Sequence, residues 1–232
     1  MHMIAIVPAT AWSLVVFDTV CVAVACSFLI AATLPIHEQN TKKRFWFWSA
    51  NFLVYALFLG TIVQSGYLQS MFLPLGPLFM SLTVLLPILL GFSRKGGRMA
   101  EALPTVVLVG FQSFRLPLEI VLHAWYRSGT IPQSMTWEGS NWDILTGVLA
   151  IVCLPFVGKR LWVAWVFNTI GILLLFNVVR VAVMSSPVPF GWKVEPPLEL
   201  IVQLPYAFIV PICVGGAFLG HVLLTRKLWK QR

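Results

Sequence analysis

Long apolar stretches separated by short polar segments make up most of the chain. A helix that crosses a membrane needs about 20 consecutive, mainly apolar residues. We predict seven such spans, at residues 11–34, 45–64, 72–92, 101–125, 142–158, 161–184 and 198–224. Because no internal repeat or linker divides residues 1–232, the pattern predicts a single all-α domain, a polytopic integral membrane bundle of seven transmembrane helices.

The fourth and fifth predicted spans also allow a second topology. Basic loops flank this pair on both sides, as expected of a re-entrant pair that dips into the membrane from the cytoplasm. The fourth span is long enough for a full crossing at about 1.5 Å per residue. Seven complete crossings are therefore the preferred prediction.

Composition supports the membrane interpretation. Hydrophobic residues make up 59% of the chain and charged residues only 10%, whereas soluble domains carry about 25% charged residues. So few charges cannot cover a water-exposed surface, and the apolar stretches must face lipid. Membrane lipid and a small-molecule ligand are the expected partners.

The net charge of +8 is explained by the distribution of basic residues and does not indicate nucleic-acid binding. Twelve of the 16 lysines and arginines follow the first, third, fifth and seventh predicted spans: Lys42, Lys43, Arg44, Arg94, Lys95, Arg98, Lys159, Arg160, Arg226, Lys227, Lys230 and Arg232. Positive charge stays on the cytoplasmic side. The N-terminus is therefore predicted outside and the C-terminus in the cytoplasm. The compact layout favours a bacterial inner membrane.

The fourth predicted span, which contains "FRLPLEIVLHAWY", carries an unusual polar stripe. Gln112, Arg115, Glu119 and His123 fall within a quarter of the circumference of a helix. A charge near the bilayer centre costs about 2.5 to 3.5 kcal/mol, so such a stripe must face other helices or water. Arg115 and Glu119 are expected to pair one turn apart, and Pro117 to bend the helix.

Other predicted spans and one loop place polar residues in the same half of the membrane. We expect all of them to converge on an outward-facing polar cavity, with two ordered loops over its mouth. The candidate ligand-binding residues are Asp18, Gln112, Arg115, Glu119, His123, Glu138, Asp143, Asn177, Arg180, Glu199, Gln203 and Tyr206.

Simpler structural interpretations stand beside this one. Arg115 and Glu119 can form an ion pair that only fixes helix packing. Arg180 can extend to the outer interface, and Glu138 and Asp143 can order the loop. Intramembrane charge nonetheless favours a functional site.

Several familiar chemistries are not predicted. The four histidines are spread over both faces of the membrane, so no zinc site is expected. The cysteines lie in apolar stretches and lack metal-ligand spacing. No phosphate-binding loop, dinucleotide fingerprint or nucleophile elbow is present. We therefore expect no cofactor and no metal.

Three functions remain open. Prolines and glycines that interrupt the spans near charged groups favour a transporter or binding protein for a small zwitterionic or anionic solute. The alternative is an intramembrane enzyme acting on a lipid-linked or amphipathic substrate at the outer leaflet, with Glu119, Glu138 or Asp143 as acid or base. A seven-helix sensor is a third hypothesis, weakened because no output domain is attached.

Overall fold

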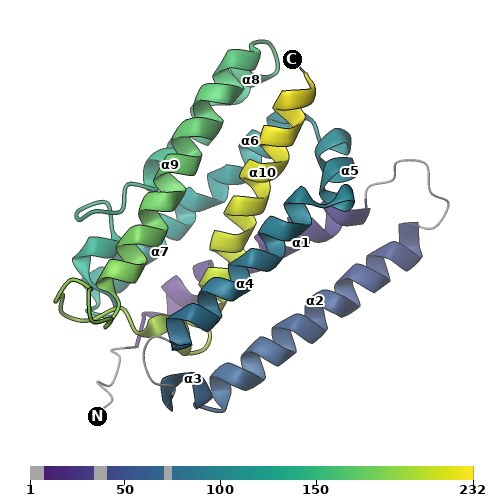
Figure 1. Ribbon diagram of the computed structural model, residues 1–232. Helices are drawn as coiled ribbons and strands as arrows, with labels where there is room; N and C mark the ends of the chain where they lie inside the picture. The colour runs from purple at the N-terminus through teal and green to yellow at the C-terminus, as the bar shows by residue number, and fades with distance from the viewer. Residues whose placement is uncertain (1–7, 34–40, 71–74, 232) are drawn as a thin grey trace.

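The computed structural model describes residues 8–33, 41–70 and 75–231, which form helices and connecting segments without a strand (Figure 1). The α-helices are α1 (Ala11–Thr33), α2 (Thr41–Gln64), α3 (Tyr67–Ser70), α4 (Leu75–Phe92), α5 (Arg94–Ala102), α6 (Thr105–Phe111), α7 (Arg115–Arg127), α8 (Ile144–Val157), α9 (Leu161–Ser185) and α10 (Gly215–Lys230). Four short 3₁₀-helices are η1 (Gln112–Phe114), η2 (Gln133–Met135), η3 (Leu200–Val202) and η4 (Tyr206–Phe208), and η5 (Ile209–Val214) is a π-helix.

Among the described residues, five helical segments are long and apolar enough to cross a membrane. They are Ala11–Thr33, Lys42–Gln64, Thr105–Arg127, Leu161–Ser185 and Tyr206–Lys230. The bent pair formed by α4 and α5, at 68° to each other, adds a sixth if it is counted as one span. The predicted fifth span corresponds to α8, which is apolar but has only 14 residues. The chain is thus an all-helical protein with several membrane-compatible helices.

Two predicted boundaries are corrected by the structure. The last span was expected at 198–224, but its helix begins at Tyr206 and reaches Lys230. Pro196, Pro197 and Pro205 supply no backbone N–H, so the residues around them cannot form a regular α-helix. The fourth span begins after Pro104, because the residue before a proline is pushed into an extended conformation.

Smaller shifts affect the other predicted spans. The second helix begins at Thr41 rather than at residue 45. Residue 34 of the first span and residues 72–74 of the third lie outside the described residues.

α10 is the central helix of the bundle. In the most apolar stretch of the segment Tyr206–Lys230, which contains α10, 67% of the residues are buried, against 11% for Lys42–Gln64 in α2. Figure 1 shows α10 running between α9 on one side and α4 on the other. Leu219, Leu223 and Leu224 join the core that α10 shares with α5, α6, α8 and α9.

A second core occupies the other half of the bundle. Phe17, Trp125 and Tyr206 pack there with edge-to-face ring contacts. Cys21 and Cys213 lie in the same core as free thiols, with their sulfur atoms 3.8 Å apart. This core joins α1, α7 and the segment that precedes α10.

The predicted basic clusters meet at one end of the bundle, which we call the basic end. Arg226 donates to the backbone carbonyls of Gly91 and Ser93 at the α4–α5 junction, with N···O distances of 2.6 and 2.7 Å. Lys230 forms an ion pair with Glu101 on α5. Figure 1 places the α8–α9 turn and the C-terminus at this end as well.

Candidate functional site

Three charged side chains meet inside the bundle: Arg115 and Glu119 on α7, and Asp143 at the start of α8. Arg115 and Glu119 are each 1% exposed and Asp143 is 5% exposed. The Nη1 atom of Arg115 lies 2.6 Å from Oδ1 of Asp143. The expected ion pair between Arg115 and Glu119 is thus replaced by one to Asp143, which the chain between α7 and α8 brings into the interior.

Asn141 fixes the geometry of this cluster. Its Nδ2 donates to Oε1 of Glu119 at 2.9 Å and to the carbonyl of Met135 at 3.0 Å. Its Oδ1 accepts the backbone N–H of Asp143 at 3.1 Å, the local bond typical of an Asx turn. Asn141 therefore bonds the carboxylate of Glu119 directly and fixes the backbone of Asp143 beside it.

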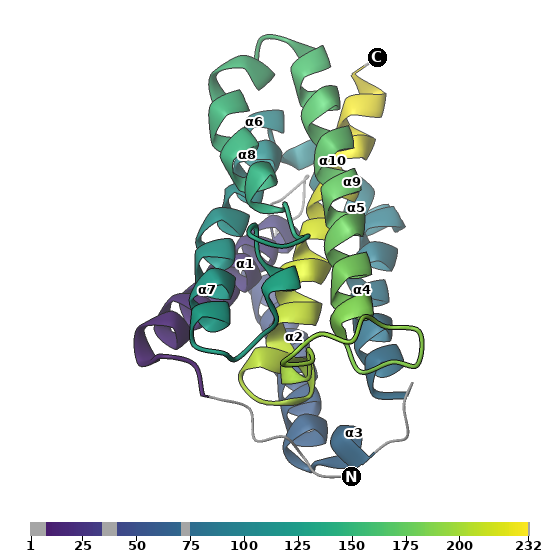
Figure 2. The ribbon, with the colours of Figure 1, turned by 90° about the vertical axis from the view of Figure 1, so that its left-hand side faces the viewer.

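The connection between α7 and α8 folds into the bundle. We expected it to cover the mouth of the cavity, but Thr130, Ile131 and Thr136 are 3%, 0% and 0% exposed. The carbonyl of Ser140 accepts Nδ2 of Asn177 at 2.7 Å, which ties the segment to α9, and Figure 2 shows it between α7 and α9. Irregular backbone deep in a membrane protein is tolerated where protein surrounds it.

Pro117 and Gly147 explain how α7 and α8 come together. Since Pro117 has no N–H for the carbonyl of Ser113, that carbonyl instead accepts the N–H of Arg115, and the helix passes through the 3₁₀ turn η1. Gly147 faces this break: a Cβ there would lie 2.6 Å from the backbone nitrogen of Leu116. The missing side chain allows the close approach that places Asp143 beside Arg115.

A small cavity of about 70 Å³ adjoins the cluster. Arg115, Glu119 and Asp143 line it together with apolar side chains of α9, η3, η5 and α10. Two polar atoms of the cluster, Nη2 of Arg115 and Oε2 of Glu119, are buried without a protein partner. Buried polar groups are nearly always hydrogen-bonded, so these two atoms indicate a place for water or a polar ligand.

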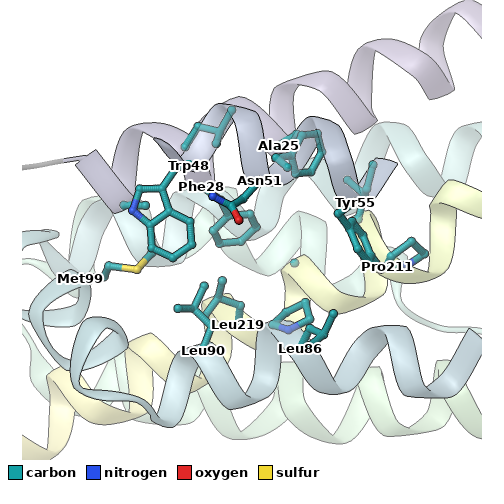
Figure 3. A pocket seen from close by; sticks show the side chains of 16 residues that line it. Ala25, Phe28, Trp48, Asn51, Tyr55, Leu86, Leu90, Met99, Pro211 and Leu219 are labelled. Atoms are coloured by element: carbon teal, nitrogen blue, oxygen red, sulfur yellow. The ribbon is translucent and has the colours of Figure 1, made fainter. Parts of the chain in front are cut away.

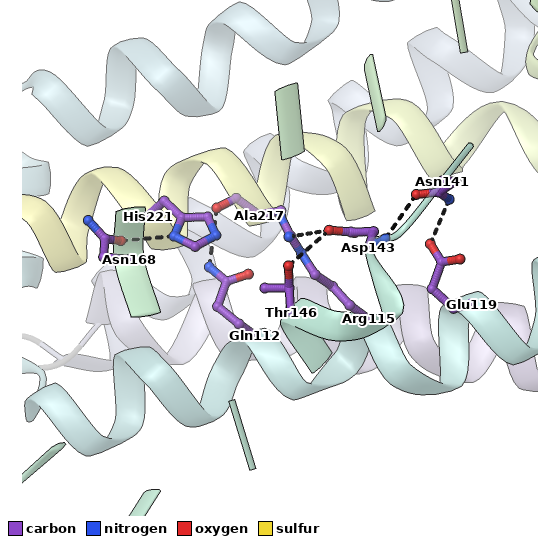
Figure 4. Close-up of polar contacts among 9 residues, drawn as sticks. All are labelled: Gln112, Arg115, Glu119, Asn141, Asp143, Thr146, Asn168, Ala217 and His221. Carbon is purple, nitrogen blue, oxygen red and sulfur yellow. Dashed lines mark hydrogen bonds and ion pairs between the residues drawn. The ribbon is translucent and has the colours of Figure 1, made fainter. Parts of the chain in front are cut away.

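Polar side chains continue from the cluster toward the basic end (Figure 4). Gln112 donates to the carbonyl of Ala217 at 3.3 Å. Farther along, Nδ1 of His221 lies 2.9 Å from Oδ1 of Asn168, which in turn donates from Nδ2 to Thr225 at 2.7 Å. We call the cluster and these residues together the polar line. It runs between α7, α8, α9 and α10.

At the opposite end of α7, His123 lies above Glu119 on the predicted stripe. Its Nε2 is 3.6 Å from a carboxylate oxygen of Glu138, and its ring stacks on Trp137 with centroids 4.3 Å apart. The His123 and Glu138 side chains are 23% and 40% exposed. This pair, one helical turn beyond Glu119, is more accessible than the cluster, and we count it as one end of the polar line.

Two charged residues expected in the cavity lie outside it. Asp18 is exposed on α1. Arg180 is also exposed; it donates to Asn177 at 2.8 Å and stacks on Trp192 with its guanidinium carbon 5.4 Å from the ring centroid. We expected all of the charged candidate residues to converge on one cavity. Asp18 and Arg180 do not, because each side chain points to the outer surface of its helix.

The residues expected on the last span occupy irregular backbone. Glu199 and Gln203 flank η3 and are half-buried. Tyr206 is buried, but its hydroxyl accepts the backbone N–H of Ala9 at 3.2 Å. Their four- and three-residue spacing resembled a helix, yet Pro196 and Pro197 before Glu199 and Pro205 before Tyr206 prevent one.

Sequence reasoning left Asn141, Thr146, Asn168 and His221 out of the candidate site. Thr146 donates to Asp143 at 3.1 Å. A signal for the other end existed: His221 and Thr225 are one turn apart on α10, and His221 lies within its apolar stretch before Arg226. Among the described residues, no group of three or more His, Cys, Asp and Glu side chains is placed to hold a metal ion.

Residues 92–229 match a family described as a domain of unknown function, DUF8737. The chain belongs to this family. The matched region runs from the end of α4 into the last turn of α10 and contains the whole polar line. Comparison with curated proteins and with solved structures gives no match.

Proposed function

We propose that the protein binds a small zwitterionic solute at Arg115 and Glu119 and carries it across the membrane. One observation carries the proposal: a buried cation and a buried carboxylate, one helical turn apart, line the same cavity, and each keeps a polar atom without a protein partner. Nη2 of Arg115 would bind the anionic group of the solute. Oε2 of Glu119 would bind its cationic group.

The charge of the cluster favours a zwitterion over a simple anion. Arg115 faces two carboxylates, Glu119 and Asp143, and Asp143 already occupies one side of the guanidinium. An anion would bring a third negative group into a desolvated site, which is unfavourable. A solute with both charges adds none to the total and satisfies both free atoms.

The size of the cavity restricts the solute further. Its volume of about 70 Å³ has room for about five water-sized groups. A solute with about that number of non-hydrogen atoms, such as glycine, fits without expansion of the site.

The polar line favours transport over binding alone. It passes from the His123–Glu138 pair at one end, through the cluster, to Asn168 and Thr225 near the basic end. Chains of acidic residues and histidine mark solute and proton routes in membrane transporters. The π-helix η5 lines the cavity too, and such interruptions recur at functional sites.

For the topology we propose seven crossings of a bacterial inner membrane, with the basic end on its cytoplasmic side. α8 is the short one: its 14 residues extend about 21 Å, less than the hydrocarbon thickness of about 30 Å. The buried segment 128–143 would take up the remaining depth.

The test is counterflow of radiolabelled glycine in proteoliposomes, with acetate and methylammonium as anionic and cationic probes of similar size. Wild-type protein is expected to exchange glycine faster than either probe. Glu119→Gln is nearly isosteric and removes only the charge, so it should lower glycine exchange about tenfold or more, since hydrogen bonds to a charged group contribute about 1.5 to 3 kcal/mol.

Asp18→Asn and Arg180→Gln are the matched controls, because they remove exposed charges outside the cluster. Both should retain glycine exchange. Equal exchange of all three probes, or full glycine exchange by folded Glu119→Gln protein, contradicts the proposal.

A further inference from the structure

A second, larger cavity lies between α1, α2, α4 and α10, away from the polar line (Figure 3). Its volume is about 440 Å³, within the range of about 300 to 1,000 Å³ typical of small-molecule pockets. Figure 3 shows an elongated space, with Trp48 and Met99 at one end and Tyr55 and Pro211 at the other. Apart from Asn51 and Tyr55, its lining is apolar or aromatic without a charge.

The cavity exists because α2 is held mainly near its two ends. Near its C-terminus, Leu59 and Val63 pack on Leu68 and Met80. Near its N-terminus, Arg44 donates to the carbonyl of Ala32 at 3.0 Å. Between these contacts α2 stands away from α4. Protein interiors rarely leave apolar space of this size unfilled, so a flexible apolar group is the expected occupant.

Positive charge gathers at one end of the cavity. The ammonium group of Lys95 lies 4.8 Å from the ring centroid of Trp48, which lines that end. Arg44 bonds to Ala32, another lining residue. The nearby carboxylate of Glu101 is already engaged by Lys230. An apolar space with cations at its membrane-surface end matches the two parts of an anionic lipid.

We propose that this cavity is a binding site for an anionic phospholipid. One acyl chain lies between α2 and α4 along Trp48 to Tyr55, a length of about 10 Å on the helix. The phosphate lies beside Lys95. Basic sites between transmembrane helices on the cytoplasmic side bind lipid headgroups in this way. The site is separate from the polar line, so it does not depend on the proposed transport.

The test is native mass spectrometry of detergent-purified protein mixed with equal amounts of phosphatidylglycerol and phosphatidylcholine of the same chain length. Wild-type protein should retain phosphatidylglycerol preferentially. Lys95→Gln should reduce that preference about fivefold, the typical contribution of one basic residue to binding of anionic lipid. The matched control is Lys159→Gln, an exposed lysine at the α8–α9 turn.

A second pair of variants tests the acyl-chain site. Leu86 lines the cavity and is 57% exposed, whereas Leu89 on the same helix is 63% exposed and does not line it. Leu86→Trp should displace the bound lipid, and Leu89→Trp should leave it in place. Equal retention in both variants overturns the proposal. Loss of a dimer instead of lipid on Leu86→Trp also overturns it and assigns the cavity to a second copy of the chain.

Discussion

Within the described residues, Arg115 forms its ion pair with Asp143. Removing a guanidinium from water is expensive, and the attraction of Asp143 compensates only if the geometry is good. The 2.6 Å contact and the additional bond from Thr146 to Asp143 meet that condition. The ion pair therefore stabilises the bundle only as a complete unit.

Asp143→Ala is expected to destabilise the protein by about 3 to 5 kcal/mol, because Arg115 would remain buried and unpaired. Thermal unfolding in detergent, followed by tryptophan fluorescence, measures the loss. Asp18→Asn removes an exposed carboxylate and should change stability by no more than about 0.5 kcal/mol.

A double variant separates an unpaired charge from lost packing. Arg115→Met combined with Asp143→Leu removes both charges and should be more stable than Asp143→Ala alone. If the double variant is instead as unstable as the sum of its two single variants, the ion pair contributes nothing specific and the interpretation of Asp143 fails.

At the scale of elements, the approach of α8 to α7 decides whether the cluster forms. Gly147 is the contact point, and the atoms facing it belong to the backbone of Leu116. A backbone cannot move aside as a flexible side chain can. Any side chain at 147 would push the two helices apart where Arg115 meets Asp143.

Gly147→Ala should therefore cost about 1 to 3 kcal/mol, the usual effect of overpacking, and should also lower glycine exchange. Gly60→Ala is the matched control, since nothing lies within 4 Å of a Cβ at that helical position, and Ala is the better helix former there by about 0.5 to 1 kcal/mol. Unfolding midpoints of the two variants give the comparison. Equal midpoints would mean that α8 can shift at no cost.

Helical periodicity predicted α7 and its stripe, because the three- and four-residue spacing of Gln112, Arg115 and Glu119 depends only on the local helical geometry. It could not predict that Asp143 pairs with Arg115, since that contact depends on how residues 128–143 fold back. The same periodicity was misleading at Glu199 and Gln203, where prolines override the spacing. Local sequence patterns thus predicted the helices, whereas the contacts between side chains of different helices depend on the tertiary fold.

On the scale of the whole molecule, the two ends of the bundle differ in chemistry. At the basic end, Arg226 and Lys230 bind α4 and α5. At the other end, His123 and Glu138 are partly accessible beside Trp137. Interfacial aromatic rings together with one-sided positive charge indicate a fixed orientation in the membrane.

The orientation can be tested with two exposed basic residues at opposite ends, Arg127 at the C-terminus of α7 and Lys159 after α8. In a background with Cys26 changed to Ala, Arg127→Cys should react with a membrane-impermeant maleimide in intact cells. Lys159→Cys should react only after the membrane is permeabilised, because the proposed topology places its turn in the cytoplasm. If α7 and α8 instead formed a re-entrant pair, Arg127→Cys would stay protected in intact cells, and the accessible end of the polar line would have no contact with the outside.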